Sequence, residues 1–479
     1  MSKELAFTSA WEMRNLIIDK KISPIEITKI YFERINRLDS QLNSYLTLNE
    51  KEALESAARA EKSILSGESL GKLHGIPIAI KDLEMTAGIR TTQGSLIYKN
   101  HIPTVDSIVV ERLRNAGAII LGKTNASEFG AVGFNDNRLG DHCRNPWNTE
   151  RTTGASSGGA GAAMAAGLCS LATGGDGGGS IRIPASYCGL YGLKNTQGRV
   201  PKYSGIPGQH IPNFLSQQGP MSRSVRDSTM MLEVLAGYDS RDPSSLRDPV
   251  PDYIGSLDKD IKGLRLGWSS DFGFANSEPE ILETTYKAAK VFEDLGCYLD
   301  ESKLKLTDPF FSCYWAMFKA VIKFNINQLE ENQDKLTWYM KHVLESSRDM
   351  TIEEYIKALG ERDIMISKFE DEFAKFDLLL SPTMPSTAFP VDNPPKSIGG
   401  KDVYPSPETM SYIYGSHPFT YPINIIGYPA ATVPCGFSKD GMPIGLHIIG
   451  KKGDDETVIA ASSAFENARP WVQHTPSVS

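Results

Sequence analysis

The sequence predicts an α/β fold, a single large domain whose central mixed β-sheet is covered by helices on both faces. Helical and strand-like segments alternate along much of the 479 residues. Tight hairpin signals occur beside segments long enough for helical crossovers, so both antiparallel and parallel pairing are expected. No repeat or low-complexity linker divides the chain. We therefore expect one domain over residues 1–479, although length alone would suggest about three.

The N-terminal elements follow from helix start signals and one apolar run. Ser23-Pro24-Ile25-Glu26 is a capping box with proline at the first helical position, so a helix is expected to begin there. A second helix is expected over residues 52–65. The continuous apolar run at residues 76–80 predicts a buried strand. This strand would place Lys81 at its end.

The alternation of elements continues toward the C-terminus. Helices that stop at a glycine are each followed by a short strand. Ser277 and Glu280 form a second capping box at the start of one of these helices. Asp440-Gly441 between two apolar segments predicts a hairpin. The expected elements are helices at 106–116, 277–295 and 454–467, strands at 118–121, 297–299 and 376–380, and a surface loop at 388–407.

Composition excludes several classes of protein. The net charge is −8 and no basic cluster occurs, which argues against a nucleic-acid partner. The six cysteines are scattered without metal-ligand spacing, which predicts no metal and a reducing compartment. No apolar run is long enough for a signal peptide or a membrane span. We expect a cytoplasmic protein, without a metal or organic cofactor.

Two motif matches fail on their context. Residues 117–124 satisfy the phosphate-loop pattern, but a helix precedes them and their middle is aliphatic, so they are better explained as a strand. Residues 154–158 satisfy the nucleophile-elbow pattern, which requires a hydrophobic strand before it. The preceding residues are polar and include a proline. The elbow would make Ser156 the nucleophile and would need a histidine such as His447 or His474.

The most informative segment runs from residue 151 to 200. Gly177-Gly178-Gly179-Ser180 allows successive amides to point into one concavity, where they could stabilise an oxyanion beside an attacking serine. Asp176 and Arg182 flank this segment, and we expect them to hold its shape. No histidine has a clear link to Ser180. Lys81, which can act as a base only if burial keeps it neutral, is the better candidate.

These residues resemble the amidase signature family. Its pattern is a G-G-S-S-G-G-S loop, then G-x-D-x-G-G-S-I-R-x-P-A, with a lysine in a preceding K-D. The resemblance implies that Ser180 forms an acyl-enzyme and that Ser156, which follows a cis peptide bond, bridges Ser180 and Lys81. It implies an oxyanion hole from the amides of residues 177–180 and a substrate pocket at Gly130 and Ser156. The supporting residues around these groups would be Ser157, Asp176 and Arg182.

The resemblance covers nearly the whole chain, with a signature core at about 70–230 and a variable, substrate-side region at about 240–375. Further matching segments are Gly122–Asn125 with Glu128-Phe129, Arg144–Trp147, Gly219–Met221, Ser224–Asp227 and Gly427–Ala430. The departures from the pattern remove no reacting group, although the extra glycines could loosen the oxyanion hole. They are Ala155, Ala160, Gly175, Gly177 and Asn195.

The resemblance implies an amidase that hydrolyses the carbon–nitrogen bond of a small-molecule amide. The alternative is the glutaminase subunit of a tRNA-dependent amidotransferase, which needs partner subunits. Ala126-Ser127-Glu128-Phe129 departs from the Met-Asp-Glu-Phe typical of that subunit, and residues 349–382 resemble free amidases. An inactive scaffold is disfavoured because all three reacting groups are present. Substrate identity is left open, as is a homodimer. An aromatic cluster could be core packing or an aryl pocket: Phe310, Phe311, Tyr314, Trp315 and Phe318.

Overall fold

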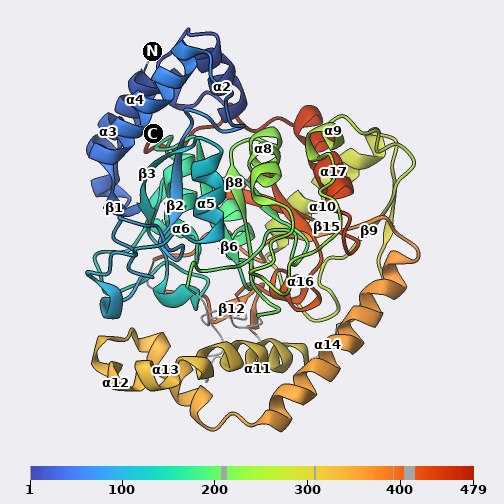
Figure 1. Cartoon of the computed structure of the whole chain (residues 1–479). Helices are drawn as coiled ribbons and strands as arrows, with labels where there is room; N and C mark the ends of the chain where they lie inside the picture. The colour runs from blue at the N-terminus through green and yellow to red at the C-terminus, as the bar shows by residue number, and fades with distance from the viewer. Residues whose placement is uncertain (1, 207–212, 307–308, 392, 404–415) are drawn as a thin grey trace.

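The computed structural model describes residues 2–206, 213–306, 309–391, 393–403 and 416–479 (Figure 1). A single α/β domain surrounds an 11-stranded mixed sheet with the order β1-β3-β2-β6-β8-β7-β14-β15-β11-β9-β10. The strands are β1 (Tyr45–Leu48), β2 (Pro77–Lys81), β3 (Ile119–Thr124), β6 (Leu171–Asp176), β7 (Tyr191–Lys194), β8 (Gln217–Ser222), β9 (Arg265–Trp268), β10 (Tyr298–Glu301), β11 (Leu378–Pro382), β14 (Ala430–Phe437) and β15 (Pro443–Gly450).

The sheet combines two parallel groups with an antiparallel centre. β2 pairs in parallel with β3 and β6, and β9 pairs in parallel with β10 and β11. Between these groups the strands from β6 to β11 pair antiparallel. Two small sheets lie outside the main one, β4 (Arg144–Asn145) with β5 (Asn148–Thr152) and β12 (Ser397–Ile398) with β13 (Lys401–Asp402). The prediction of a mixed sheet is confirmed.

Helices cover both faces of the sheet, as predicted. On β15, a Cβ built on Gly450 would contact Val458 in α17 (Asp455–Ala468), whereas one built on Gly445 would contact Ser186 in α7 (Arg182–Cys188). Side chains alternate along a strand, so these helices lie on opposite faces. The other core helices are α2 (Ala10–Ile18), α3 (Pro24–Leu38), α4 (Glu50–Ser66), α5 (Ile108–Asn115), α6 (Gly158–Ala165), α8 (Val225–Leu235), α9 (Tyr253–Ser256), α10 (Pro279–Asp294) and α16 (Tyr421–Ile426).

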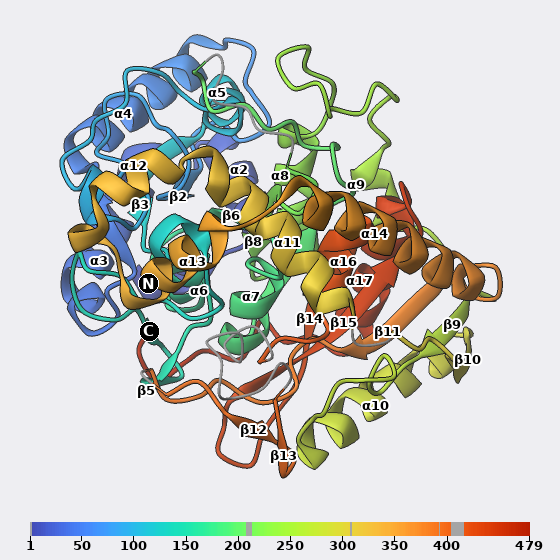
Figure 2. The same ribbon diagram turned by 90° about the horizontal axis from the view of Figure 1, so that it is seen from below.

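A further group of helices lies beyond the ends of the central strands: α11 (Pro309–Phe324), α12 (Ile326–Glu331), α13 (Trp338–Arg348) and α14 (Ile352–Phe373). They are below the sheet in Figure 1 and in front of it in Figure 2, which is seen from below. They share a second hydrophobic cluster with Ile183, Tyr187 and the residues of α16. Phe311 and Tyr314 are buried there, which confirms core packing for part of the aromatic cluster. The side chain of Phe310 lies outside the described residues.

Most predicted elements occur within a few residues of their expected bounds. Ser23 caps α3 by accepting from the Ile25 amide, and the residues expected to be a strand rather than a phosphate loop form β3. The capping box at Ser277 was wrong, because the N-cap of α10 is Glu278 and has no side-chain cap. The expected surface loop includes β12 and β13, and its last residues, 404–407, lie outside the described residues.

Candidate active site

Lys81 ends β2 with its side chain fully buried, at 1% exposure. Its Nζ lies 2.8 Å from Ser156 Oγ, 2.8 Å from Ser157 Oγ and 3.1 Å from the carbonyl oxygen of Gly175. The amide of Lys81 donates to Thr173 Oγ1 on the neighbouring β6. Burial lowers the pKa of Lys81 to about 7, although the negative charges of Glu84 and Asp176 oppose this shift. No carboxylate is hydrogen-bonded to the ammonium within the described part of the chain.

Ser156 and Ser157 lie in the turn that leads into α6. The peptide bond between Ala155 and Ser156 is cis, as the family resemblance implied. The Ser157 amide donates to the carbonyl oxygen of Ser180 at 3.2 Å, so this turn contacts the glycine loop at residues 177–180. A Cβ built on Gly130 would lie 3.1 Å from Ser156 Oγ. The structure therefore brings both predicted substrate-pocket residues, Gly130 and Ser156, next to each other.

Ser180 lies between β6 and α7, after the three predicted glycines. The residue is 8% exposed, and its hydroxyl has no hydrogen-bond partner among the described residues. The Gly179 amide donates to Asp176 Oδ1 at 2.8 Å. The amides of Gly177, Gly178 and Ser180 have no such partner in the described ranges. Of the four amides expected to form an oxyanion hole, three therefore remain available to a ligand.

Asp176 and Arg182 support this loop through buried hydrogen bonds. Asp176 accepts the Gly179 amide, the Ile181 amide at 3.2 Å and the Arg182 guanidinium at 2.9 and 3.0 Å. Burial alone would raise the pKa of Asp176, but the Arg182 charge and these hydrogen bonds hold it well below its usual range. Arg182 also donates to Asn424 in α16. Both side chains are fully buried, and their ion pair links the glycine loop to the start of α7.

The arrangement gives no support to the motifs rejected on sequence grounds. β5, which precedes residues 154–158, is a polar strand of the small β4–β5 sheet, unlike the strand of a nucleophile elbow. His447 Nε2 lies 3.0 Å from Arg182 Nη1, and His474 packs against Phe437 near the C-terminus. Neither histidine is hydrogen-bonded to Ser156. Lys123, the lysine of the phosphate-loop match, is buried and donates to the Glu84 carbonyl and to Thr86.

Two residues near the glycine loop were missed by sequence reasoning. A Cβ built on Gly178 would lie 2.5 Å from the hydroxyl oxygen of Tyr314, so this tyrosine covers the loop. Thr420 Oγ1 donates to the Gly178 carbonyl at 2.6 Å. The sequence marks Tyr314 only as part of an aromatic cluster, and Thr420 lies in no motif. Their contacts depend on packing between segments far apart in the sequence.

Among the described residues, no three His, Cys, Asp or Glu side chains gather as metal ligands would. The six cysteines are all free thiols. Within the same ranges, no helix is both long and apolar enough to cross a bilayer. The best candidate for reactive chemistry is the buried Lys81, which has Ser156 and Ser157 at hydrogen-bonding distance and the glycine loop next to them.

Comparison with known proteins agrees with the sequence resemblance. The model of the amidase family matches residues 26–459. The chain is 36% identical to a glutamyl-tRNA(Gln) amidotransferase subunit of Moorella thermoacetica, with 99% of each chain covered. It is 33% identical to an acylamidase of Rhodococcus erythropolis, covering 99% of this chain and 98% of that one. A bacterial aryl acylamidase structure superposes with a TM-score of 0.91 at 31% identity, covering 98% of this chain and 97% of that one.

The fold and the motifs together define an enzyme that acts on carbon–nitrogen bonds. The chain belongs to the amidase family, in its amidase signature form. The relatives include both hydrolases and an amidotransferase component, so membership alone does not distinguish these activities.

Proposed function

We propose that this chain is an amidase that hydrolyses the carbon–nitrogen bond of a small-molecule amide through a Ser180 acyl-enzyme. Ser156 and Lys81 form the proton relay. The observation that carries the proposal is the position of Lys81 Nζ, 2.8 Å from Ser156 Oγ in a fully buried site. A lysine in such a site loses its proton near neutral pH and can then serve as a base.

The hydrogen bonds around Lys81 fit a neutral amine. A neutral amine has two N–H donors and one lone pair. The Gly175 carbonyl can only accept, so it takes one N–H, and Ser157 Oγ can accept the second. The lone pair is then left for the Ser156 hydroxyl. This arrangement orients the base toward the serine that relays the proton.

Each step of the proposed reaction conserves protons. Ser180 Oγ attacks the carbonyl carbon, its proton passes to Ser156 Oγ, and Ser156 passes its own proton to Lys81 Nζ. When the carbon–nitrogen bond breaks, the same relay returns a proton to the leaving nitrogen. Water then attacks the ester with the relay acting as base, which releases the carboxylic acid and restores Ser180.

The amides of Gly177, Gly178 and Ser180 would stabilise the oxyanion. Their donors have no partner among the described residues, whereas the amide of Gly179 is bound to Asp176. Removal of one oxyanion-hole donor typically costs about 3 kcal/mol of barrier. We therefore narrow the predicted oxyanion hole to these three amides and assign Gly179 to loop support.

The direct test is turnover by the purified chain without added proteins. We expect release of amine or ammonia from simple, aryl or acyl amides, and loss of this activity in Ser180→Ala. Failure of the pure chain on every amide, together with activity in the presence of partner subunits, would overturn the free amidase.

The second candidate is a glutaminase component of an amidotransferase. It is favoured by the 36% identity to the glutamyl-tRNA(Gln) amidotransferase component of Moorella thermoacetica over 99% of both chains. The same three side chains would release ammonia from glutamine. Dependence of turnover on partner subunits separates this candidate from the free amidase.

A further inference from the structure

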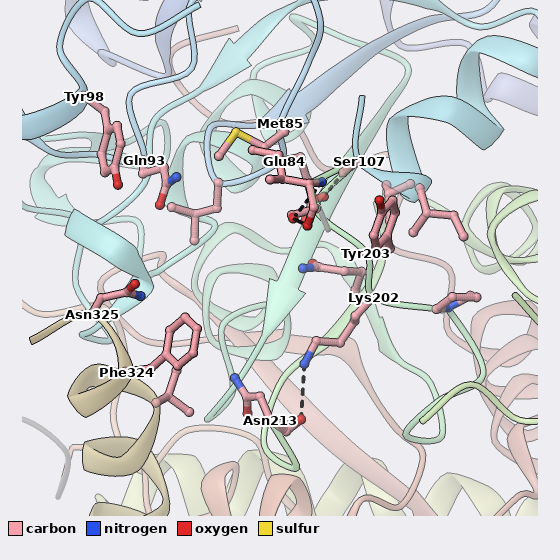
Figure 3. A pocket seen from close by; sticks show the side chains of 18 of the residues that line it. Glu84, Met85, Gln93, Tyr98, Ser107, Lys202, Tyr203, Asn213, Phe324 and Asn325 are labelled. Atoms are coloured by element: carbon pink, nitrogen blue, oxygen red, sulfur yellow. Dashed lines mark hydrogen bonds between the residues drawn. The ribbon is translucent and has the colours of Figure 1, made fainter. Parts of the chain in front are cut away.

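A cavity of about 490 Å³ is lined by Glu84, Lys202 and residues of α11 (Figure 3), and Leu83 connects it to the candidate active site. Leu83, two residues after Lys81, forms part of its wall. A Cβ built on Gly130 would lie 2.9 Å from Leu83 Cδ1 and 3.1 Å from Ser156 Oγ, so Leu83 and Ser156 contact the same glycine. The opposite wall comes from the C-terminal end of α11 and from α12. The cavity has the size of a small-molecule site.

Glu84 presents a carboxylate with unused hydrogen-bonding capacity to this cavity. The residue is only 6% exposed. Its Oε2 accepts from the Ser107 hydroxyl at 2.7 Å, and its Oε1 has no partner within the described ranges. This oxygen is not enclosed by protein atoms, so it faces the cavity and can accept a hydrogen bond from a ligand. It is therefore a good site for an ammonium or another donor of a ligand.

Lys202 presents the opposite charge to the same cavity. Figure 3 shows its side chain extending to Asn213, where Nζ donates to the backbone carbonyl at 3.2 Å. No second acceptor for Nζ occurs among the described residues, so two of its three donors remain available. Burial lowers the pKa of Lys202 to about 8, with Asp242 and Glu84 opposing the shift, so the ammonium form still predominates at pH 7.

The remaining lining mixes apolar and polar side chains, and among the described residues it contains neither an arginine nor a further carboxylate. Amide side chains contribute both donors and acceptors: Gln93, Asn213, Gln218, Asn325 and Gln328. A simple anion would be repelled by Glu84, and a simple cation by Lys202. Only a ligand that carries both charges can pair its ammonium with Glu84 and its carboxylate with Lys202.

We propose that this cavity binds the remote end of the amide substrate, and that this end is zwitterionic, with its ammonium at Glu84 and its carboxylate at Lys202. The inference rests on the proposed amidase function, because it takes the scissile amide to lie near Ser180. The substrate class is the amide of an amino-acid-like molecule. Glutamine is one member of this class.

The test uses four primary amides of similar length with different charges. Glutamine carries both charges, 4-carbamoylbutanoate only the carboxylate, 4-aminobutanamide only the ammonium, and butanamide neither. We expect wild-type kcat/KM, measured by ammonia release, to be at least about tenfold higher for glutamine than for butanamide, since charge-assisted hydrogen bonds typically contribute this much. A wild-type ratio near one would overturn the inference.

Variants assign the two ends of the ligand. In Glu84→Gln, hydrolysis of the ammonium-only amide should become less efficient relative to butanamide by about tenfold in kcat/KM, mainly through KM. Lys202→Gln should do the same for the carboxylate-only amide. Matched surface variants, Glu293→Gln and Lys452→Gln, should keep both ratios. Glu84→Gln also changes the pKa of Lys81, which alters kcat/KM of every amide by the same factor. Dividing by kcat/KM of butanamide removes that common factor. Unchanged ratios in both cavity variants would contradict the assignment.

Failure of the proposed function is distinguishable from failure of this inference. If butanamide is hydrolysed in a Ser180-dependent way without preference for charge, the amidase stands and the zwitterion site falls. If no amide is hydrolysed, calorimetric titration of Ser180→Ala protein with glutamine tests the site alone. Binding that Glu84→Gln and Lys202→Gln each weaken about tenfold supports the site, and no binding at millimolar glutamine refutes it.

Discussion

Replacing Lys81 by arginine separates a base from a fixed positive charge. Arginine retains the charge and can donate to Ser156, Ser157 and the Gly175 carbonyl, the three partners of the lysine. It cannot be deprotonated in a protein, so it cannot accept the proton of Ser156. If Lys81 is the base, Lys81→Arg should be as inactive as Lys81→Ala.

The expected size of the loss follows from the role of a base. General-base help contributes roughly 10²–10⁴-fold, so kcat/KM of both variants should fall by at least that much. The wild-type enzyme should also depend on pH, since the pKa of Lys81 is lowered to about 7. Only enzyme molecules in which Lys81 is a neutral amine can catalyse the reaction. Their fraction is about 90% at pH 8 and about 10% at pH 6, so kcat/KM should be roughly tenfold lower at pH 6.

The assay is the initial rate of amide hydrolysis between pH 5.5 and 9, after circular dichroism has confirmed that each variant is folded. An arginine variant within about tenfold of wild type would refute the base, because tenfold is only about 1.4 kcal/mol of barrier. The Glu84→Gln variant tests the same pKa. The Glu84 charge stabilises the Lys81 ammonium, so its removal should move the rise in kcat/KM to lower pH.

Three further predictions concern the loop and the chemistry. A fluorophosphonate probe should label Ser180, and Ser180→Ala should lose labelling and turnover; an adduct on Ser156 would instead favour the nucleophile elbow. Gly178→Ala should lower kcat by about 100-fold or more, because its Cβ would lie 2.5 Å from the Tyr314 hydroxyl, whereas Gly177→Ala, whose Cβ would have no neighbour closer than 3.7 Å, should keep most activity. Equal losses would contradict this steric argument. EDTA should leave activity unchanged, and a loss that zinc restores would refute a metal-free mechanism.

Sequence reasoning succeeded where the signal was local. The apolar run before Lys81 predicted a strand that ends at this lysine, and the structure places the end of β2 there. The proximity of Lys81 to Ser156 was inferred from the family resemblance, since the two residues are 75 positions apart and the segment between them contains no local signal of contact. The start of α10 was misplaced by one residue because Glu278 occupies the N-cap position without a side-chain cap.

The contacts that could not be predicted are those between distant segments. The Gly175 carbonyl reaches Lys81 because β2 and β6 pair in parallel, and a single sequence does not specify such pairing. Tyr314 covers Gly178, and Glu84 and Lys202 face one cavity, only after α11 packs against the core. Such sites require the tertiary arrangement, although the residue types were visible from the start.

The connection between β10 and β11 shows how this enzyme could acquire new specificities. Both strands pair in parallel with β9, so the chain must return across the sheet between them. α14, with 22 residues and a length of about 33 Å, is twice as long as β11 at about 17 Å. The part of α14 that exceeds the length of the strand packs against α11, where Cys313 contacts Ala358. Residues 309–348 could therefore be exchanged with those of a relative, giving chimaeras with a remodelled cavity wall while every strand keeps its neighbours.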